Sequence, residues 1–177
     1  RRVQALEAMQ AVRSVAASSM DLEELQRLID AAREANVAAD EVAAAEKTLA
    51  EVAARREKAA AVLTAAEAPA NTELDLDVLE KAVTEAREAG VAKATVTPVA
   101  ERLAKVGKER TKASDALSAA QAPGLSSLDV AELERAIDKA HAWVAQAIVA
   151  SASANLREAR RVQALEAMQA VRSVAAS

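Results

Sequence analysis

The chain has no cysteine, a single histidine, and only three glycines and three prolines among its 177 residues. Without cysteine there is no disulfide framework, no thiolate metal site and no cysteine nucleophile. A lone imidazole, His141, excludes a multi-histidine metal centre and most histidine-based proton relays. What the chain has instead is 50 alanines and 19 valines. Because alanine is the best helix former and helix breakers are so few, we expect an all-α protein.

Aromatic residues and long apolar runs are also scarce. Trp143 is the only aromatic residue, and no run of 18 uncharged apolar residues is present, so we expect no membrane insertion and no signal peptide. A net charge of −4 argues against nucleic-acid binding. The glycines are isolated, and the serines and acidic residues lack a matching base or second acid. We therefore expect a cytoplasmic protein that is not an enzyme and has no catalytic residue, cofactor or metal.

The two ends of the chain carry the same sequence. Residues 1–18, RRVQALEAMQAVRSVAAS, recur letter for letter as residues 160–177, at an offset of 159. No functional constraint would hold every surface position fixed, so a large block has been duplicated, in nature or by engineering. We interpret the chain as one 159-residue super-repeat followed by the first helix of the next copy.

A second periodicity of 54 residues lies inside the block. The segment AREANV at residues 32–37 recurs as AREAGV at residues 86–91. A third copy is three residues shorter, and repeats of this length are typical of stacked helical units. The predicted domains are three bundle units at residues 1–53, 54–107 and 108–159, and the first helix of a further block at residues 160–177.

Each 54-residue unit is predicted to contain a short and a long helix. The short helices are expected at residues 21–36, 75–90 and 128–144, and the long helices at residues 40–68, 97–122 and 148–176. Asn36 and Gly90 suit the left-handed position that ends a helix, and Thr97–Pro98 suits a helix start. The third unit has Val144 in place of Gly90, so its turn must be built differently.

Helix length predicts how these helices pack. Apolar residues along the long helices alternate in steps of three and four, a heptad seam that needs partner helices along its whole length. A helix of about 30 residues is about 45 Å long, and one of about 16 residues is about 24 Å long. Each short helix can therefore cover only half of a long one. We expect tandem three-helix bundles that share long continuous linker helices, an extended rod, in preference to a curved two-layer solenoid.

This arrangement resembles spectrin-type repeats, in which a continuous linker helix joins successive three-helix bundles. The resemblance is architectural and covers the whole chain, although the conserved tryptophan of spectrin repeats has no counterpart in the first two units. The near-identical Ala/Val-rich blocks also resemble giant tandem-repeat cytoskeletal linkers of protists, such as the rod of the kinetoplastid tripartite attachment complex. These resemblances imply a cytoskeleton-associated protein with cytoskeletal protein partners at the ends of the parent array.

Two sets of residues are candidates for a functional role. Trp143 is expected to pack over the shortened third turn, and the alternative is that Trp143, Ile148 and Val149 contact a protein partner. His141 is expected to be an exposed helix residue.

Arginines on the otherwise apolar stripe of the long helices form the second set. Arg56, Arg110 and Arg161, with Arg2 in the same frame, are predicted to mark the junctions where one bundle gives way to the next. There the guanidinium would reach a carboxylate or solvent, and phosphate binding is the alternative.

The leading functional hypothesis is a structural spacer. The chain would be a segment of a long tandem-repeat helical rod that sets distance and transmits tension between cytoskeletal or organelle attachment points. The alternative is a repeated protein-binding platform that presents one docking face per 159-residue block, with avidity supplied by number. A third interpretation, an engineered repeat protein, is disfavoured by the diverged 54-residue units and the shortened third copy.

Overall fold

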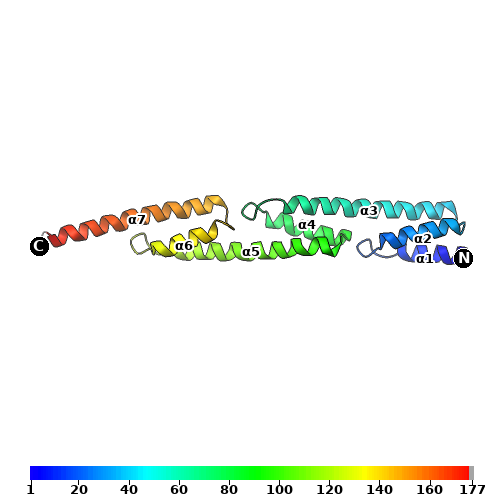
Figure 1. The fold of residues 1–177 in the computed structure, drawn as a ribbon, viewed down its shortest axis with the longest axis horizontal. Coiled ribbons are helices and arrows are strands. Elements are labelled where there is room, and N and C mark those ends of the chain that lie inside the picture. The colour runs from blue at the N-terminus through cyan, green and yellow to red at the C-terminus, as the bar shows by residue number, and fades with distance from the viewer. Residues whose placement is uncertain (176–177) are drawn as a thin grey trace. The chain divides into compact units, whose positions relative to one another are not determined.

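A computed structural model describes residues 1–175, and this part of the chain folds into seven α-helices with no strand (Figure 1). The helices are α1 (Arg2–Arg13), α2 (Leu22–Glu34), α3 (Ala39–Glu67), α4 (Leu76–Ala89), α5 (Lys93–Gln121), α6 (Val130–Ala140) and α7 (Gln146–Ala175). The all-α prediction is confirmed. The last two residues of the duplicated segment, 176 and 177, lie outside the described residues. None of the described helices is long and apolar enough to cross a bilayer.

The three short helices begin in the same way, 54 residues apart. Asp21, Asp75 and Asp129 each precede the first helical residue and accept hydrogen bonds of 3.0–3.1 Å from main-chain N–H groups two or three residues ahead. A carboxylate at this position satisfies N–H groups that have no partner inside the helix. The predicted starts of the short helices are therefore correct to within two residues.

The ends of the short helices differ. Asn36 and Gly90 adopt the predicted left-handed conformation, with φ of 53° and 78°. In the third copy the helix ends at Ala140, earlier than expected, and the N–H groups of Trp143 and Val144 both donate to its carbonyl oxygen, at 3.0 and 2.8 Å. This tight turn needs no left-handed residue, which explains how valine replaces glycine there.

The start of α5 also differs from the prediction. The helix begins at Lys93 instead of Thr97, and Pro98 lies inside it. The N–H groups of Thr95 and Val96 already donate to the carbonyl oxygen of Ala92. The signal of a capping threonine followed by proline therefore misplaces the start of the helix, and Val96 and Val99 in this first part of α5 are buried.

The contacts divide the chain into two compact units. Unit 1 contains residues 1–68 and 75–101, and unit 2 contains residues 69–74 and 102–177, so the boundary falls within α5. This division follows contacts, whereas the predicted 54-residue domains follow sequence periodicity, so those domain bounds stay a prediction.

In unit 1, the long helix α3 has different neighbours along its two halves (Figure 1). Its first half, from Val42 to Val52, shares a buried cluster with Met9 of α1 and with Leu25 and Ile29 of α2. Contacts of α4 with α3 fall on the second half, where side chains from Arg55 to Val62 and from Glu85 to Ala89 line one hollow. One continuous helix therefore serves two successive sets of partners.

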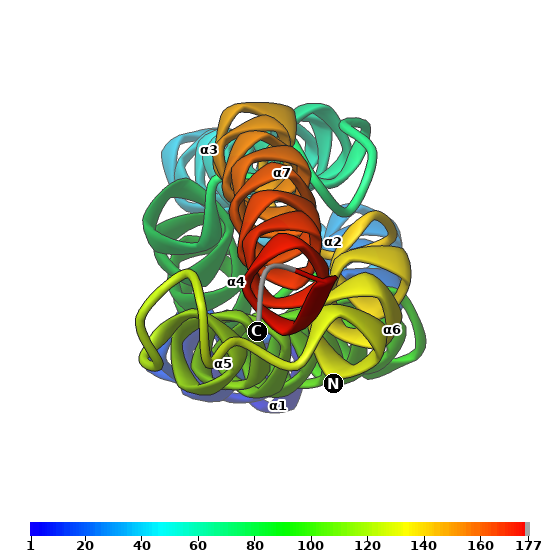
Figure 2. The ribbon, with the colours of Figure 1, turned by 90° about the vertical axis from the view of Figure 1, so that its left-hand side faces the viewer.

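In unit 2, one buried apolar cluster joins three helices. It contains Leu117 of α5, Leu133 and Ile137 of α6, and Val149 and Leu156 of α7. Seen end-on, these helices stand around the cluster in a triangle (Figure 2). No polar side chain is buried in the described residues, so burial of small and medium apolar side chains holds this unit together.

Candidate functional site

Arg56 lies near the middle of α3 and joins two segments that are distant in the sequence. Its Nη2 atom donates hydrogen bonds to the carbonyl oxygens of Ala17, at 2.9 Å, and Met20, at 2.5 Å, both in the connection between α1 and α2. Its Nε atom donates to the carbonyl oxygen of Ala89, the last residue of α4, at 3.2 Å. The guanidinium thereby caps the C-terminal end of α4, where a positive charge is favourable. We call this set of contacts the Arg56 junction.

Gly90 allows the two segments of the Arg56 junction to approach each other. It has a left-handed φ of 78°, and a Cβ atom on it would lie 2.6 Å from the carbonyl oxygen of Ser18 and 2.9 Å from Nη2 of Arg56. Any side chain would therefore push the end of α4 away from the connection that follows α1. The backbone conformation and the close approach both require glycine here.

The Arg110 junction repeats this geometry within unit 2. Arg110 Nε donates to the carbonyl oxygens of Asn71, in the connection between α3 and α4, and Trp143, in the turn after α6, both at 3.1 Å. Nη2 of Arg110 also donates to the Asn71 carbonyl oxygen. Asn71 and Trp143 lie 54 residues after Ala17 and Ala89, so the same two main-chain positions are bound again.

On α7, Gln163 makes the contacts that correspond to those of Arg56 and Arg110. The predicted residue, Arg161, does not make them. Gln163 Nε2 donates to the carbonyl oxygens of Leu125, at 3.2 Å, and Leu128, at 2.8 Å, in the connection between α5 and α6. Arg161 instead lies two residues earlier on a largely exposed part of α7, with Nη1 3.8 Å from a carboxylate oxygen of Glu158. We call the contacts of Gln163 the Gln163 junction.

A signal for Gln163 was present in the sequence. The predicted offset of 51 residues takes Arg110 to Arg161, but the buried seam of α7 follows that of α5 at 53 residues, as Val149 follows Val96. An offset of 53 takes Arg110 to Gln163. Aligning the apolar seams, in place of the arginines, would have identified the correct residue.

The side chains at these junctions bind the main chain of the protein itself. The sequence predicted a carboxylate or solvent as the partner of the arginines, whereas the guanidinium groups of Arg56 and Arg110 donate to main-chain carbonyl oxygens. Carbonyl groups at helix ends and in connections need donors. The arrangement therefore fixes loops against a long helix, and the donors involved are not directed at an anion.

Of the three residues predicted to contact a partner, one is part of the core. Val149 is only 2% exposed, because it lies in the buried cluster of unit 2 between α6 and α7. Its neighbour Ile148 is 49% exposed. Trp143 is half-buried and packs against the same cluster. His141 is exposed and directly follows α6.

Trp143 also lines a hollow on the surface of unit 2. The other lining residues are Glu109, Lys112, Ala113 and Ala116 of α5, Asp138 and Lys139 of α6, and Ala142. Lys112 Nζ donates a hydrogen bond of 2.9 Å to Glu109 Oε1, and this bond lowers the pKa of the Glu109 carboxyl. The acidic and basic side chains are mixed here, so the hollow favours neither a cation nor an anion.

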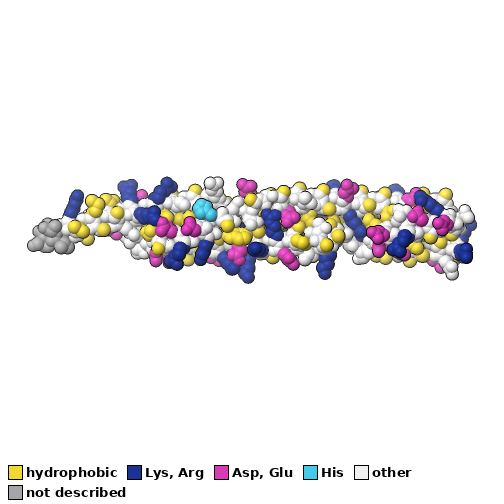
Figure 3. Space-filling view, in the orientation of Figure 1, with side chains coloured by type: hydrophobic (Ala, Val, Ile, Leu, Met, Phe, Trp, Pro, Cys, Tyr) yellow, Lys and Arg dark blue, Asp and Glu magenta, His cyan; other side chains and the backbone are white. Residues whose placement is uncertain are grey.

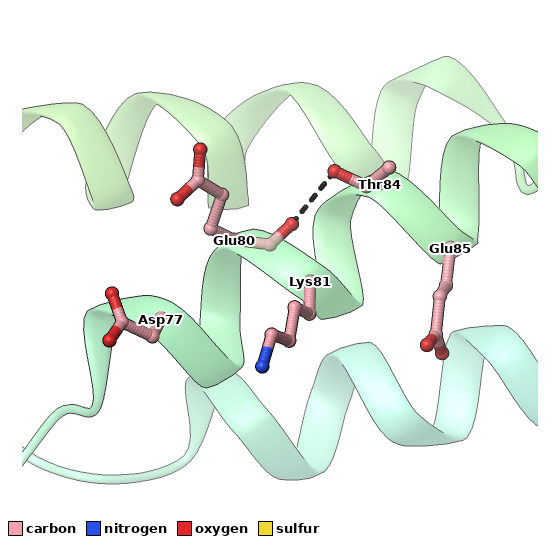
Figure 4. A pocket seen from close by; sticks show the side chains of 5 residues that line it. All are labelled: Asp77, Glu80, Lys81, Thr84 and Glu85. Atoms are coloured by element: carbon pink, nitrogen blue, oxygen red, sulfur yellow. Dashed lines mark hydrogen bonds between the residues drawn. The ribbon is translucent and has the colours of Figure 1, made fainter.

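A hollow on the surface of α4 is lined by polar and charged side chains of this helix. Figure 4 shows a hollow on α4 lined by Asp77, Glu80, Lys81, Thr84 and Glu85, all from this one helix. The hydroxyl of Thr84 donates to the main-chain carbonyl oxygen of Glu80 at 3.0 Å, and the carboxylates point in different directions. Throughout the described residues, no three acidic, histidine or cysteine side chains are grouped so that they could hold a metal ion.

Comparison with known proteins adds no family assignment. Neither the models of protein families, nor the curated proteins, nor the solved structures contain a match to this chain.

Proposed function

We propose that the chain is a structural spacer, a segment of a helical rod built from tandem three-helix bundles that share their long helices. In this proposal the length of the molecule is its function. The rod sets a distance and transmits tension between cytoskeletal or organelle attachment points. Its partners are protein assemblies at the ends of the parent array, in the cytoplasm.

The observation that carries the proposal is the packing of α3. α1 and α2 contact its first half, α4 contacts its second half, and the helix runs without a break for 29 residues. A helix that finishes one bundle and starts the next has this pattern of neighbours. Because bending at the join would bend the helix itself, such sharing stiffens an array.

The junctions are a second support. The Arg56, Arg110 and Gln163 junctions each tie the middle of a long helix to the connection that precedes a short helix. The residues bound in these connections recur at intervals of 54, from Ala17 to Asn71 to Leu125. A spacer needs uniform steps, and repeated contacts at fixed intervals provide them.

The step length gives the proposal a quantitative test. Each unit adds about half a long helix, about 22–25 Å, so a 159-residue block adds about 70 Å. Small-angle X-ray scattering on this chain and on a chain with two blocks should show the longest dimension growing by about 70 Å. A radius of gyration near the ~16 Å of a compact 177-residue domain, or growth much below 70 Å, would contradict the spacer.

The alternative is a repeated protein-binding platform with one docking face per block. Burial of Val149 removes one of its three candidate residues, and what favours it is the exposure of Ile148 beside half-buried Trp143. Substituting Ile148 with glutamate separates the two functions. If the chain is a binding platform, this substitution abolishes binding of a partner. If the chain is a spacer, it leaves the scattering profile unchanged.

A further inference from the structure

A hollow between α3 and α4 of unit 1 has walls of opposite charge. Two basic residues, Arg55 and Lys58, line it on α3, and two acidic residues, Glu85 and Glu88, line it on α4. All four residues are exposed, and within the described residues none of their side chains makes a hydrogen bond or an ion pair. We call this hollow the α3–α4 groove, and its lining residues are Arg55, Lys58, Ala59, Val62, Glu85, Glu88 and Ala89.

Exposed apolar side chains accompany the charges of the α3–α4 groove. Val62 lies four residues after Lys58 on the α3 wall and is 40% exposed. Val78 lies seven residues before Glu85, which places it on the same side of α4 two turns away, and it is 50% exposed. Figure 4 shows Glu85 pointing toward the neighbouring ribbon of α3, and Figure 3 shows apolar side chains at the surface between charged ones over α3. The groove therefore combines an apolar surface with two charged edges.

The corresponding hollow of unit 2 does not separate its charges. Its lining residues follow those of the α3–α4 groove by 54 positions. Each wall there carries one acidic and one basic residue, Glu109 and Lys112 on α5 and Asp138 and Lys139 on α6. Lys112 also donates a hydrogen bond of 2.9 Å to Glu109. The helical repeat therefore does not require walls of opposite charge at this place, and their presence in unit 1 calls for an explanation outside the fold.

A second copy of the same groove is complementary to these walls in one orientation. A two-fold axis parallel to the two helices turns α3 of one chain toward α4 of the other at the same level. Arg55 and Lys58 then face Glu85 and Glu88 of the second copy, and the contact occurs twice because the interface is symmetric. A two-fold axis across the helices would place basic wall on basic wall and acidic wall on acidic wall, which is strongly unfavourable. We propose that the α3–α4 groove is a docking surface for the α3–α4 groove of a second copy of this chain, with the paired helices of the two copies parallel and in register.

The chemistry of the groove also sets the character of this association. Single ion pairs between exposed side chains contribute little free energy, so the charges fix the partner and its orientation more than the strength of binding. Burial of Val62 and Val78 supplies the apolar contribution. Because the charged walls are exposed, salt screens their attraction. The association should therefore be reversible, dependent on concentration and weakened by salt.

Two complementary variants test the pairing of the walls. Arg55→Glu/Lys58→Glu makes both walls acidic, and Glu85→Lys/Glu88→Lys makes both walls basic. In low salt, sedimentation velocity should show the wild-type mass rising with concentration from 18.4 kDa toward twice that value. Each variant alone should stay at 18.4 kDa at those concentrations, because facing like charges raise the dissociation constant about tenfold or more. An equimolar mixture of the two variants should form a 1:1 complex. A wild type that is monomeric up to its solubility limit, or a mixture that forms no complex, would overturn the proposal.

A control variant separates the groove from net charge. Glu57→Lys/Glu80→Lys makes the same change of charge on the same two helices, and neither residue lines the α3–α4 groove. In Figure 4, Glu80 points to the side of α4 opposite to Glu85. This variant should dimerise like the wild type. If it dissociates as fully as Glu85→Lys/Glu88→Lys, while circular dichroism shows both folded, net charge controls the association and the groove does not.

Cross-linking tests the orientation, since the chain has no cysteine of its own. A parallel pair places the two copies of Val78→Cys at the same level. Pairing in the opposite direction about the charged residues would separate them by about 20 Å along the helices, because seven residues of helix are about 10 Å long. A short bismaleimide should therefore link Val78→Cys chains in low salt, and adding Glu85→Lys/Glu88→Lys should prevent the link. Val78→Cys chains that dimerise but do not cross-link would contradict the parallel arrangement.

This association goes beyond the spacer function, because it depends on exposed charges of unit 1 and on no property of the array. Scattering in high salt, where the dimer dissociates, tests the spacer separately. A spacer that does not self-associate would pass the scattering test and fail the sedimentation test. A compact protein that pairs through the groove would do the reverse.

Discussion

At the scale of single residues, the fold depends on a few polar and glycine positions within an almost uniform background of alanine and valine. Arg56 donates to three carbonyl oxygens from two segments, and Gly90 lets those segments meet. Arg110 and Gln163 occupy corresponding places. Gln163 is uncharged, yet it makes contacts of the same kind. The contacts therefore require a side chain that is long enough and that donates hydrogen bonds, and they do not require a positive charge.

Gly90 and Gly124 give a matched prediction at this scale. Gly90→Ala forces a Cβ into a left-handed residue, which costs about 1–2 kcal/mol, and into contact with Ser18 and Arg56, which adds to that cost. Gly124 has no positive φ and meets only Ser127 Oγ at 3.9 Å, so Gly124→Ala should be neutral or stabilise by up to about 1 kcal/mol. Urea denaturation measures both, and equal losses of stability would refute this account.

At the scale of helices, packing against neighbouring segments decides where a helix ends, and local helix propensity matters less. Residues 1–18 and 160–177 are identical, yet α1 ends at Arg13, whereas α7 continues through the equivalent Arg172 to Ala175. The sequence after Arg13 leaves the helix in unit 1 because Met20 is buried there and Ala17 accepts a hydrogen bond from Arg56. Packing, and not a local stop signal, ends α1.

The continuity of α3 leads to a second prediction. Val52 lies in its middle and is 7% exposed, and proline there removes a helical hydrogen bond and should cost about 3 kcal/mol or more. Ala39→Pro is the control, since Ala39 is the first helical residue and Ala38, with ψ of 136°, already has the conformation favoured before proline. If circular dichroism finds the two variants equally stable in urea, an unbroken α3 is not required.

The difference between local sequence signals and packing across the fold explains which features the sequence could predict. Helix type, the aspartate starts and the left-handed Asn36 and Gly90 follow from local rules. The early start of α5, the early end of α6 and the role of Gln163 depend on which residues are in contact across the fold. A fixed repeat length of 54 residues could not predict these three features, because the third copy lacks residues in more than one place.

At the scale of the whole chain, α5 belongs to both units. It begins at Lys93 in unit 1 and ends at Gln121 in unit 2. Helix formation is cooperative, so the loss of partners along its first turns weakens the rest. Trp143 lies in unit 2 and is the only aromatic side chain, so its fluorescence reports on unit 2 alone.

The third prediction uses this single reporter. Gly90→Ala acts in unit 1, and we expect it to lower the thermal midpoint of Trp143 fluorescence together with that of circular dichroism. Gly124→Ala serves as the control in the same scans. A fluorescence midpoint that stays at the wild-type value while circular dichroism shows two transitions would mean that the units unfold independently.

The location of the polar contacts has a mechanical consequence. The described core is apolar throughout, so it contains no directional polar contact that would specify the register of one helix against another. Register along the helix axis is therefore set from the rim, where Arg56, Arg110 and Gln163 bind the connections between helices. These hydrogen bonds hold each connection against one position of a long helix, so sliding of the helix past the connection must break them.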